Sequence, residues 1–505
     1  MHGFLTSSIS VTCAAALALP LTAAPATATT GRAAPASAPA SAPAGAYVPG
    51  STQSLPLTPL AGDRASTAPG TAQQGVPRRD TRRFSLVGVV WDDPATALHG
   101  RVQVRTRATA TGTWSDWQDL ETHNADHGAD PDTAESASGG VRGATAPLWV
   151  GESDGVEVRV RAADGDGDGD GTTDAAPATA PLPTGLRLEL VDPGEGAPPR
   201  PPTDATAPEE GPRTTALTTE PADPVEPAEA AEPAEAAEPV EAAEALGSAE
   251  SAETYASAEG LDASAANAGL APLGATEIPA LSRAQTESEL LALGTLTEQQ
   301  KAKPYIGPRP SITTRRGWGA DEKLREKKFV YTKKVKAAFV HHSATGNNYS
   351  CSQAPSVIRS IYRYHVKSMG WRDIGYNFVV DKCGKIYEGR AGGVAKPVLG
   401  AHTMGFNSNS MGIAVLGTYD SKKPSSAAVK AIARLTAWKL GLHGMNPRGK
   451  TYLKSGGGNL YRKGKNVRLN VISGHRDGFA TSCPGKQLYG KLGTARSSAA
   501  KYQGR

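Results

Sequence analysis

The chain divides into segments whose patterns of hydrophobic and polar residues differ. Between residues 82 and 195, apolar and polar residues alternate in short stretches such as RVQVRTRA, VEVRVRA and GLRLELV. Alternation with a period of two places the apolar side chains on one face of a strand and the polar side chains on the other. Turn-rich spacers separate these stretches. The pattern therefore predicts a small all-β, sandwich-like domain over residues 82–195, built from an antiparallel sheet with one solvated face.

The C-terminal part, residues 305–500, combines buried strands with helices. KAAFVHHSAT, SMGIAVLGTY and VISGH contain apolar runs that end in polar residues, which is typical of buried strands. PSVIRSIYRYHVKSMG and SSAAVKAIARLTAWKLGLHG have the apolar spacing of amphipathic helices, and YNFVVDKCGKIYEGR indicates a hairpin. We expect an α/β domain with a mixed central sheet flanked by helices.

The remaining segments have low complexity. Residues 29–81 are rich in Ala and Pro and predict a disordered arm. Residues 196–304 are rich in Pro, Ala and Glu, with EPAEAA repeats whose prolines prevent a long helix and whose like charges keep the chain extended. This segment is expected to be a disordered acidic linker, with room for a short helix near Thr286–Gly294.

Residues 1–28 resemble a secretory signal peptide. An apolar run with small residues precedes the Ala26-Thr27-Ala28 site, and Cys13 lies inside the run. We expect this segment to be removed and the protein to be secreted. No later run is long and apolar enough to predict a transmembrane segment.

Charge separates the two ends of the chain. The sequence has 54 Lys+Arg and 50 Asp+Glu, but the first lysine is Lys301. The net charge is roughly −26 before residue 301 and roughly +30 after it. A strongly basic C-terminal part favours a polyanionic partner, such as nucleic acid or an anionic cell wall. Because no nucleic-acid motif or run of stacking aromatics accompanies the lysines, we expect no nucleic acid.

Candidate chemistry gathers at the ends of two predicted strands. FVHHSAT supplies His341 and His342, VISGH supplies His475, and Cys483 follows within SGHRDGFATSCPG. Two histidines and a cysteine with an open fourth position can hold a catalytic Zn²⁺, which polarises a carbonyl and lowers the pKa of its water. A Cys–His nucleophile pair and half of a disulfide are the alternatives, and the pattern does not choose between His341 and His342.

The other two mature cysteines suit each other. Cys351 follows the His-containing strand and Cys383 lies in the predicted hairpin turn. A disulfide between them would close a ~32-residue loop and add roughly 3–4 kcal/mol in the chain-entropy account. Cys483 would then stay unpaired, and a bound metal would explain how its thiol escapes oxidation.

Six motifs occur together in an order that resembles one family. RRGWGA, FVHHSAT, YHVKSMGWRDIGYNFVVD, IYEGR, GAHTMGFNSNSMGIAVLG and GHRDGFATSCPG are similar to the peptidoglycan recognition protein / type 2 N-acetylmuramoyl-L-alanine amidase family. The likeness covers about a third of the chain, from Arg309 to Leu488. The N-terminal region more loosely resembles those of secreted actinobacterial members.

The resemblance implies a fold, a cofactor and roles for particular residues. The zinc ligands would be His341, His475 and Cys483, and the catalytic residues Tyr376 and Thr481. The candidate substrate-binding residues in these motifs are His365, Trp371, Asn377, Arg390, His402 and Asn407. The expected partners are peptidoglycan, as muramyl peptide, and anionic cell-wall polymers. We expect a secreted, wall-associated monomer.

Two activities are compatible with this family. The first is hydrolysis of the amide between N-acetylmuramic acid and L-alanine of peptidoglycan. The second is recognition of peptidoglycan without cleavage. Because members that bind without cutting often lack the cysteine ligand, the presence of Cys483 favours the enzyme.

Overall fold

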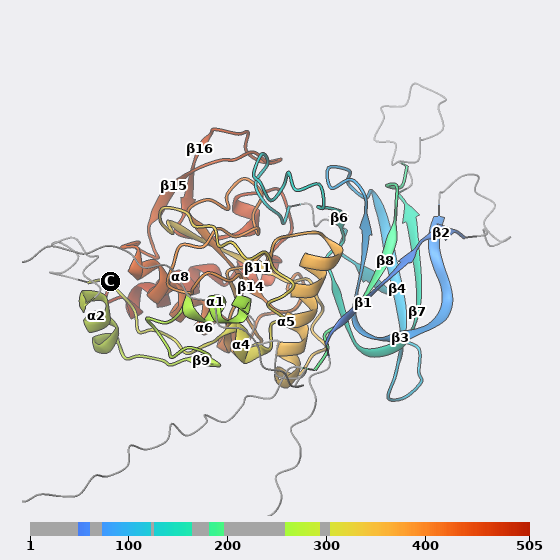
Figure 1. Ribbon diagram of the computed structural model, residues 1–505. Coiled ribbons are helices and arrows are strands. Elements are labelled where there is room, and N and C mark those ends of the chain that lie inside the picture. Colours follow the sequence, from blue (N-terminus) through green and yellow to red (C-terminus); the bar gives the residue numbers. More distant parts are fainter. Residues whose placement is uncertain (1–48, 61–72, 123–125, 164–180, 196–257, 293–303) are drawn as a thin grey trace, which may run out of the picture. The chain divides into compact units, whose positions relative to one another are not determined.

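The structure is a computed structural model of the 505-residue chain (Figure 1). It describes residues 49–60, 73–122, 126–163, 181–195, 258–292 and 304–505, and these lie in one compact unit, Gly45–Arg505. The expected signal peptide and the EPAEAA repeats fall outside the described residues. Among the helices that are described, none has the length and apolar character needed to cross a membrane.

The described residues of the N-terminal part form an eight-stranded antiparallel sheet in the order β1-β8-β3-β7-β4-β5, with β2 and β6 also paired to β3. The strands are β1 (Ser51–Pro56), β2 (Thr58–Pro59), β3 (Gln73–Trp91), β4 (Gly100–Ala108), β5 (Gln118–Leu120), β6 (Gly143–Ala144), β7 (Leu148–Ala162) and β8 (Arg187–Asp192). Register shifts along β3 bend this long strand, so that it pairs with β7 over most of its length and with β8 at its end. An apolar cluster that includes Val102, Val158 and Leu188 fills one face.

The expectation of a disordered arm over residues 29–81 is wrong for its described part. β1 and β2 lie within that range, and β3 begins at Gln73. β1 is an edge strand that pairs with β8 through its backbone, from Ser51↔Asp192 to Pro56↔Arg187. Because its sequence lacks apolar alternation, the pattern did not reveal it. The β domain is therefore larger than the predicted range 82–195.

The C-terminal domain contains the expected mixed sheet. Its seven described strands follow the order β17-β11-β14-β12-β13-β10-β9. They are β9 (Glu277–Ile278), β10 (Ile312–Thr313), β11 (Ala337–His342), β12 (Phe378–Val380), β13 (Ile386–Glu388), β14 (Ser410–Val415) and β17 (Ile472–Gly474). The first four strands in the order run parallel, and β12 and β13 form the predicted antiparallel hairpin. A separate hairpin pairs β15 (Lys450–Lys454) with β16 (Asn466–Asn470).

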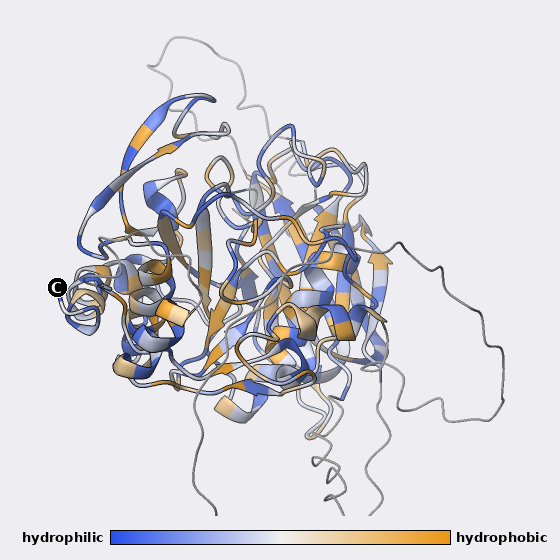
Figure 2. Cartoon of the chain, turned by 60° about the vertical axis from the view of Figure 1, so that its left-hand side comes forward, coloured by the Kyte–Doolittle hydropathy of each residue, from blue (hydrophilic) through white to orange (hydrophobic). Residues whose placement is uncertain are grey.

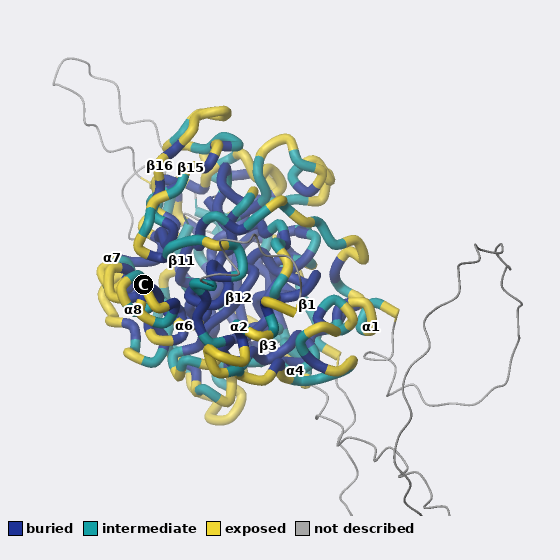
Figure 3. The backbone as a smooth tube through the Cα atoms, turned by 90° about the vertical axis from the view of Figure 1, so that its left-hand side faces the viewer, coloured by how far each residue is buried: buried dark blue, intermediate teal, exposed yellow. Residues whose placement is uncertain are grey.

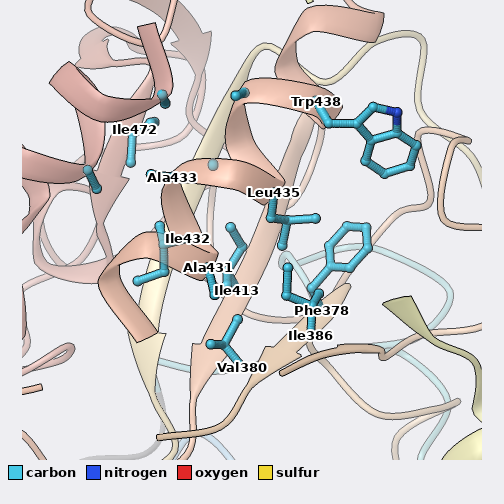
Figure 4. Close-up of a cluster of buried hydrophobic side chains, with 14 of the residues drawn as sticks. Phe378, Val380, Ile386, Ile413, Ala431, Ile432, Ala433, Leu435, Trp438 and Ile472 are labelled. Carbon is cyan, nitrogen blue, oxygen red and sulfur yellow. The ribbon is translucent and has the colours of Figure 1, made fainter. Parts of the chain in front are cut away.

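Helices complete the domain. They are α1 (Ala258–Ala265), α2 (Arg283–Ala292), α4 (Arg315–Trp318), α5 (Ala354–Arg363), α6 (Ser426–Leu442), α7 (Lys486–Tyr489) and α8 (Leu492–Tyr502). α5 continues as a π-helical segment, Tyr364–Ser368, and short 3-10 turns cover Cys351–Gln353 and His475–Asp477. α6 packs Ile432 and Leu435 against Ile413 and Phe378 of the sheet (Figure 4).

The predicted linker 196–304 also needs correction. α1, β9 and α2 lie within it, and β9 pairs with β10 at Ile312↔Ile278. Ile278 and Leu290 belong to the same apolar cluster as α6. The C-terminal domain therefore starts before residue 305, because isolated apolar residues in this Ala-rich segment complete its core.

Burial is greatest in the central strands. β11 and β12 are buried along their whole length (Figure 3), and hydrophobic residues recur along the strands (Figure 2). A second apolar cluster joins Leu86 and Val90 of β3 to Ile358 and Ile361 of α5. The hydroxyl of Tyr364 donates a hydrogen bond of 3.1 Å to the backbone oxygen of Thr145. These contacts connect the β domain to the helix beside the C-terminal sheet.

Candidate metal centre

Neighbouring parallel strands bring two of the predicted ligands together. β11 and β17 pair in parallel, with Val340 opposite Gly474. Their carboxyl ends therefore lie at the same edge of the sheet, with His341 at the end of one strand and His475 directly after the other. The centroids of the two imidazole rings are 4.5 Å apart.

The structure distinguishes the two adjacent histidines of β11. Successive side chains on a strand point to opposite faces, so His341 and His342 diverge. His341 belongs to the His/Cys cluster, whereas the Nδ1 atom of His342 accepts a hydrogen bond of 3.3 Å from the backbone N–H of Tyr419. The geometry agrees with His341 as the candidate ligand.

Cys483 returns to this edge of the sheet by a short loop. The backbone N–H of Arg476 donates to the carbonyl of Cys483 at 3.0 Å, which closes the loop after His475. The Cys483 Sγ atom lies 3.7 Å from the Nδ1 atom of His341. The Nε2 atom of His341 lies 3.3 Å from the Thr403 hydroxyl, so Nδ1 is left to face the thiol.

A fourth side chain joins the cluster from the N-terminal β domain. His127 lies between β5 and β6, and its Nε2 atom is 3.9 Å from the Cys483 Sγ atom. One ligand atom from each of His127, His341, His475 and Cys483 lies within 4.8 Å of the others. The sequence predicted an open fourth position, and in the structure His127 lies beside the three expected ligands.

The four side chains fit a zinc ion. Tetrahedral coordination with ordinary Zn–N and Zn–S bonds gives N···S separations of about 3.6 Å, close to the two distances above. In the described part of the chain, neither ring nitrogen of the buried His475 makes a well-formed hydrogen bond. Burial lowers the pKa of His475 to about 3, and burial with the neighbouring histidines holds the pKa of His341 well below its usual range. Both rings therefore stay neutral, as metal ligands must.

The environment of Cys483 argues against a thiolate nucleophile. Burial, and then the charge of Asp126, raises the pKa of the Cys483 thiol well above its usual range. Reactive cysteines instead lie in electropositive, partly exposed surroundings that lower their pKa. A cation is the partner that would make this thiol ionise. The burial of Cys483 therefore favours a metal ligand over the Cys–His pair.

The two residues expected to assist catalysis lie beside the cluster. The Tyr376 ring centroid is 5.5 Å from that of His341. Burial, and then the charges of Cys483 and Asp126, raises the pKa of Tyr376 well above its usual range, so its hydroxyl keeps its proton. The Thr481 hydroxyl accepts a hydrogen bond of 3.2 Å from the Cys483 N–H.

Three of the candidate substrate contacts meet the His127 segment. Arg390 forms a buried ion pair with Glu135, with Nη2 and Oε1 2.8 Å apart. Asn407 donates a hydrogen bond of 2.8 Å to the carbonyl of Gly128. A Cβ atom placed on Gly128 would lie 3.8 Å from the Trp371 ring, so this glycine passes directly over the indole.

The other three candidates make contacts within the C-terminal domain. The Nδ1 atom of His365 accepts from the Gly375 N–H at 3.2 Å, and its ring packs against Trp371 at a tilt of 42°, with centroids 4.4 Å apart. Asn377 accepts from the Gly412 N–H at 2.8 Å. The ring of His402 packs against His341 with centroids 5.3 Å apart. In this structure each of these side chains contacts a neighbouring backbone group or ring.

The predicted disulfide is present. Cys351 and Cys383 are bonded, with Cα atoms 6.2 Å apart. Cys483 is the free cysteine of the described residues and is buried. The bond joins the turn before α5 to the β12–β13 hairpin, as expected.

The sequence interpretation missed His127 and Asp126. They occur in NADHGAD, inside a stretch that has neither strand alternation nor a known ligand spacing. The signal was the histidine itself, one of 10 in the chain.

Two family models match the chain. Residues 331–486 match the model described as N-acetylmuramoyl-L-alanine amidase. Residues 37–184 match the model described as Rv3811 N-terminal galactose-binding domain-like. The chain thus has an N-terminal galactose-binding-like β domain followed by an α/β amidase-type domain.

Curated relatives match the C-terminal part. Peptidoglycan-recognition protein SC2 of Drosophila simulans is 31% identical over 159 residues, which are 31% of this chain and 72% of that protein. The human N-acetylmuramoyl-L-alanine amidase is 28% identical over 212 residues, 41% of this chain and 32% of that protein. Among solved structures, Drosophila PGRP-LB is 25% identical with a TM-score of 0.29, and the match covers 36% of this chain and 92% of that one. The chain belongs to the family of peptidoglycan recognition proteins and N-acetylmuramoyl-L-alanine amidases.

Proposed function

We propose that this chain is a secreted, zinc-dependent N-acetylmuramoyl-L-alanine amidase. It would hydrolyse the amide between the lactyl group of N-acetylmuramic acid and L-alanine of the peptidoglycan stem peptide. The observation that carries the proposal is the convergence of His341, His475 and Cys483, whose candidate ligand atoms lie within 4.8 Å of one another. The human amidase among the relatives supports the same reaction class.

The ligand set and its neighbours have separate tasks. His341, His475 and Cys483 would hold the zinc ion. When bound, zinc supplies a Lewis acid that polarises the scissile carbonyl and lowers the pKa of the attacking water. The protonated hydroxyl of Tyr376 would donate a hydrogen bond to the oxygen of that carbonyl as negative charge develops on it. The Thr481 hydroxyl would donate a second, uncharged hydrogen bond to the same oxygen.

Substrate position would depend on the side chains around the cluster. We assign the contacts with muramyl peptide to Trp371, Arg390 and Asn407. His365, Asn377 and His402 would set the shape of the site, because each already holds a neighbouring backbone group or ring in place. The basic surface of the domain would hold the enzyme on anionic wall polymers.

Secretion is part of the proposal. The N-terminal segment resembles a signal peptide, and the Cys351–Cys383 disulfide is a bond of oxidising compartments. We propose a location outside the cell, in contact with the cell wall.

The test is cleavage of a defined muramyl pentapeptide, followed by mass spectrometry. The full chain and its His127→Ala variant are both measured, because His127 stands beside the three expected ligands. The proposal expects free peptide with N-terminal alanine, loss of that product on chelation, and its recovery with added Zn²⁺. Binding of muramyl peptide by both zinc-loaded proteins without any cleavage would favour a recognition protein. Cleavage that survives chelation would rule out the zinc assignment.

A further inference from the structure

One segment of the β domain crosses the candidate site. Residues 126–142, here called the strap, connect β5 to β6. At one end, the carbonyl of Asp126 accepts a hydrogen bond of 3.0 Å from the Met404 N–H. At the other, the Arg142 N–H donates a hydrogen bond of 3.1 Å to the Met369 carbonyl. The strap is thus fixed to the C-terminal domain on both sides of the cluster.

The strap orients the imidazole of His127 in the way that is usual for a metal ligand. The Asp126 Oδ1 atom lies 3.0 Å from the Nδ1 atom of His127, which leaves Nε2 directed at Cys483. A carboxylate that orients the far nitrogen of a histidine is the usual support for a metal-bound imidazole. Asp126 is 3% exposed, so this support is itself buried.

The strap also occupies two of the candidate substrate-binding side chains, Asn407 and Arg390. The Asp130 Oδ1 atom accepts from the side-chain amide of Asn407 at 2.7 Å and from the Gly405 N–H at 2.8 Å. Both Glu135 carboxylate oxygens bond Arg390, at 2.8 and 2.9 Å. A buried guanidinium needs an anionic partner, and a stem-peptide carboxylate is an anion of the same kind as Glu135.

We propose that the strap is an intramolecular cap, in which His127 takes the fourth metal position while Asp130 and Glu135 occupy the candidate substrate-binding residues Asn407 and Arg390. This inference rests on the proposed function. Structural zinc sites have four protein ligands, whereas catalytic sites have three and an open position. The candidate site is therefore closed in this form. Muramyl peptide would bind once the strap has released Arg390 and Asn407.

The strap offers variants that separate its contacts. His127→Ala removes the fourth ligand. The double change Asp130→Asn with Glu135→Gln weakens the contacts of the strap with Asn407 and Arg390, and it keeps all four side chains of the metal cluster. Asp132→Asn is the matched control, because Asp132 is exposed and pairs with the equally exposed Lys463 at 2.6 Å. All four proteins are prepared as the full chain, and circular dichroism verifies that each is folded.

Two readouts do not depend on turnover. The first is the absorption spectrum of the Co²⁺-substituted protein, titrated with muramyl pentapeptide. The second is the dissociation constant of that peptide, measured by calorimetry on the zinc-loaded protein. We expect a wild-type spectrum that does not respond to the peptide. We expect the spectrum of His127→Ala to differ from that of wild type and to respond to the peptide. We expect His127→Ala and the Asp130→Asn/Glu135→Gln variant to bind the peptide about tenfold tighter or more than wild type, equivalent to about 1.4 kcal/mol. Asp132→Asn should match wild type.

The outcomes separate the cap from the amidase activity. If the strap variants bind the peptide more tightly but leave its amide intact, the cap stands and the proposed activity fails. If wild type binds and cleaves as well as both strap variants, the cap is wrong and the activity stands. An unchanged Co²⁺ spectrum in folded His127→Ala, or loss of peptide binding in that variant, also overturns the cap.

Discussion

At the scale of single residues, Tyr376 is the side chain whose catalytic contribution can be isolated most cleanly. Tyr376→Phe keeps the ring beside His341 and removes only the hydroxyl. Loss of one oxyanion donor lowers kcat by about 10²–10³. We expect that loss with little change in KM, measured by product formation in His127→Ala with and without Tyr376→Phe, because the proposed cap is absent from both. Unchanged zinc content would accompany it. A fall in zinc content that parallels the fall in kcat would instead make Tyr376 a structural residue.

Lys439 provides a test of buried charge. Its side chain is 2% exposed, and its ammonium donates hydrogen bonds to the carbonyls of Val394 and Lys396 at 2.6 and 2.7 Å. Burial lowers the pKa of Lys439 to about 7. The unfolded chain, with a lysine pKa near 10.4, then binds more protons than the folded chain between these two values. The free energy of unfolding should therefore rise with pH across this window, by up to about 1.4 kcal/mol per pH unit from this group.

The control for this titration is Lys439→Met, which fills a similar space without a charge. The variant leaves the two carbonyls unpaired at every pH, so its cost is constant. We expect the difference in unfolding free energy between wild type and variant to grow from pH 7 to pH 10 in urea melts. A difference that does not change with pH would show that Lys439 titrates normally in the folded protein.

Residue chemistry also marks the limit of prediction from the sequence. His341, His475 and Cys483 belong to local motifs at or after strand ends, so the sequence predicts both their type and the place where they meet. His127 is 356 residues from Cys483 in sequence, and nothing local in NADHGAD specifies a partner. Its position follows from how the β domain packs against α5, which is a tertiary contact that one sequence does not encode in any short pattern.

At the scale of elements, α6 carries much of the stability of the C-terminal domain. Leu435 is fully buried between the helix and the sheet (Figure 4). Leu435→Ala should lower the free energy of unfolding by about 2–5 kcal/mol, through lost transfer energy and a residual cavity. Lys430→Ala on the exposed side of the same helix is the control and should change stability little. Equal effects of the two changes in denaturant melts would contradict this account of the core.

The disulfide ties two elements that are distant in sequence. Replacing both Cys351 and Cys383 with serine opens a loop of sequence separation 32. We expect a loss of roughly 3–4 kcal/mol in unfolding free energy, because the unfolded chain gains conformational entropy. Mild reductant should destabilise wild type by a similar amount and leave the double variant unchanged. Sensitivity of the double variant to reductant would point to another thiol.

Elements with a strong apolar pattern were predicted, and those held by backbone pairing were not. β11, β14, β17, α5 and α6 appear where the pattern expected them. β1 and β9 are strands at the edges of their sheets, in segments of weak pattern that were assigned to an arm and a linker. An edge strand needs a partner with free backbone groups more than it needs apolar side chains, so its sequence carries little of the information.

At the scale of the whole molecule, two oppositely charged parts share one chain of formal net charge +4. The strap is a local instance of this division, because the acidic Asp130 and Glu135 of the β domain meet Asn407 and Arg390 of the basic domain. Opening the cap would expose positive charge and the metal cluster together. Under the proposed function and the proposed cap, wall attachment and access to the site would therefore be coupled.

Binding to anionic wall polymers should depend on salt more strongly than binding of muramyl peptide at the candidate site. Residues after 300 carry a net charge of roughly +30, and wall polymers carry phosphate and carboxylate groups. Between ~0.1 M and ~1 M salt the screening length falls from about 10 Å to about 3 Å. We expect pelleting of the full chain with an anionic wall polymer to fall by tenfold or more over this range, with a neutral polysaccharide as the control. Binding of muramyl pentapeptide to the His127→Ala variant should change far less, because its contacts are buried. Pelleting that is insensitive to salt would mean that neutral contacts, and not the basic surface, hold the protein on the wall.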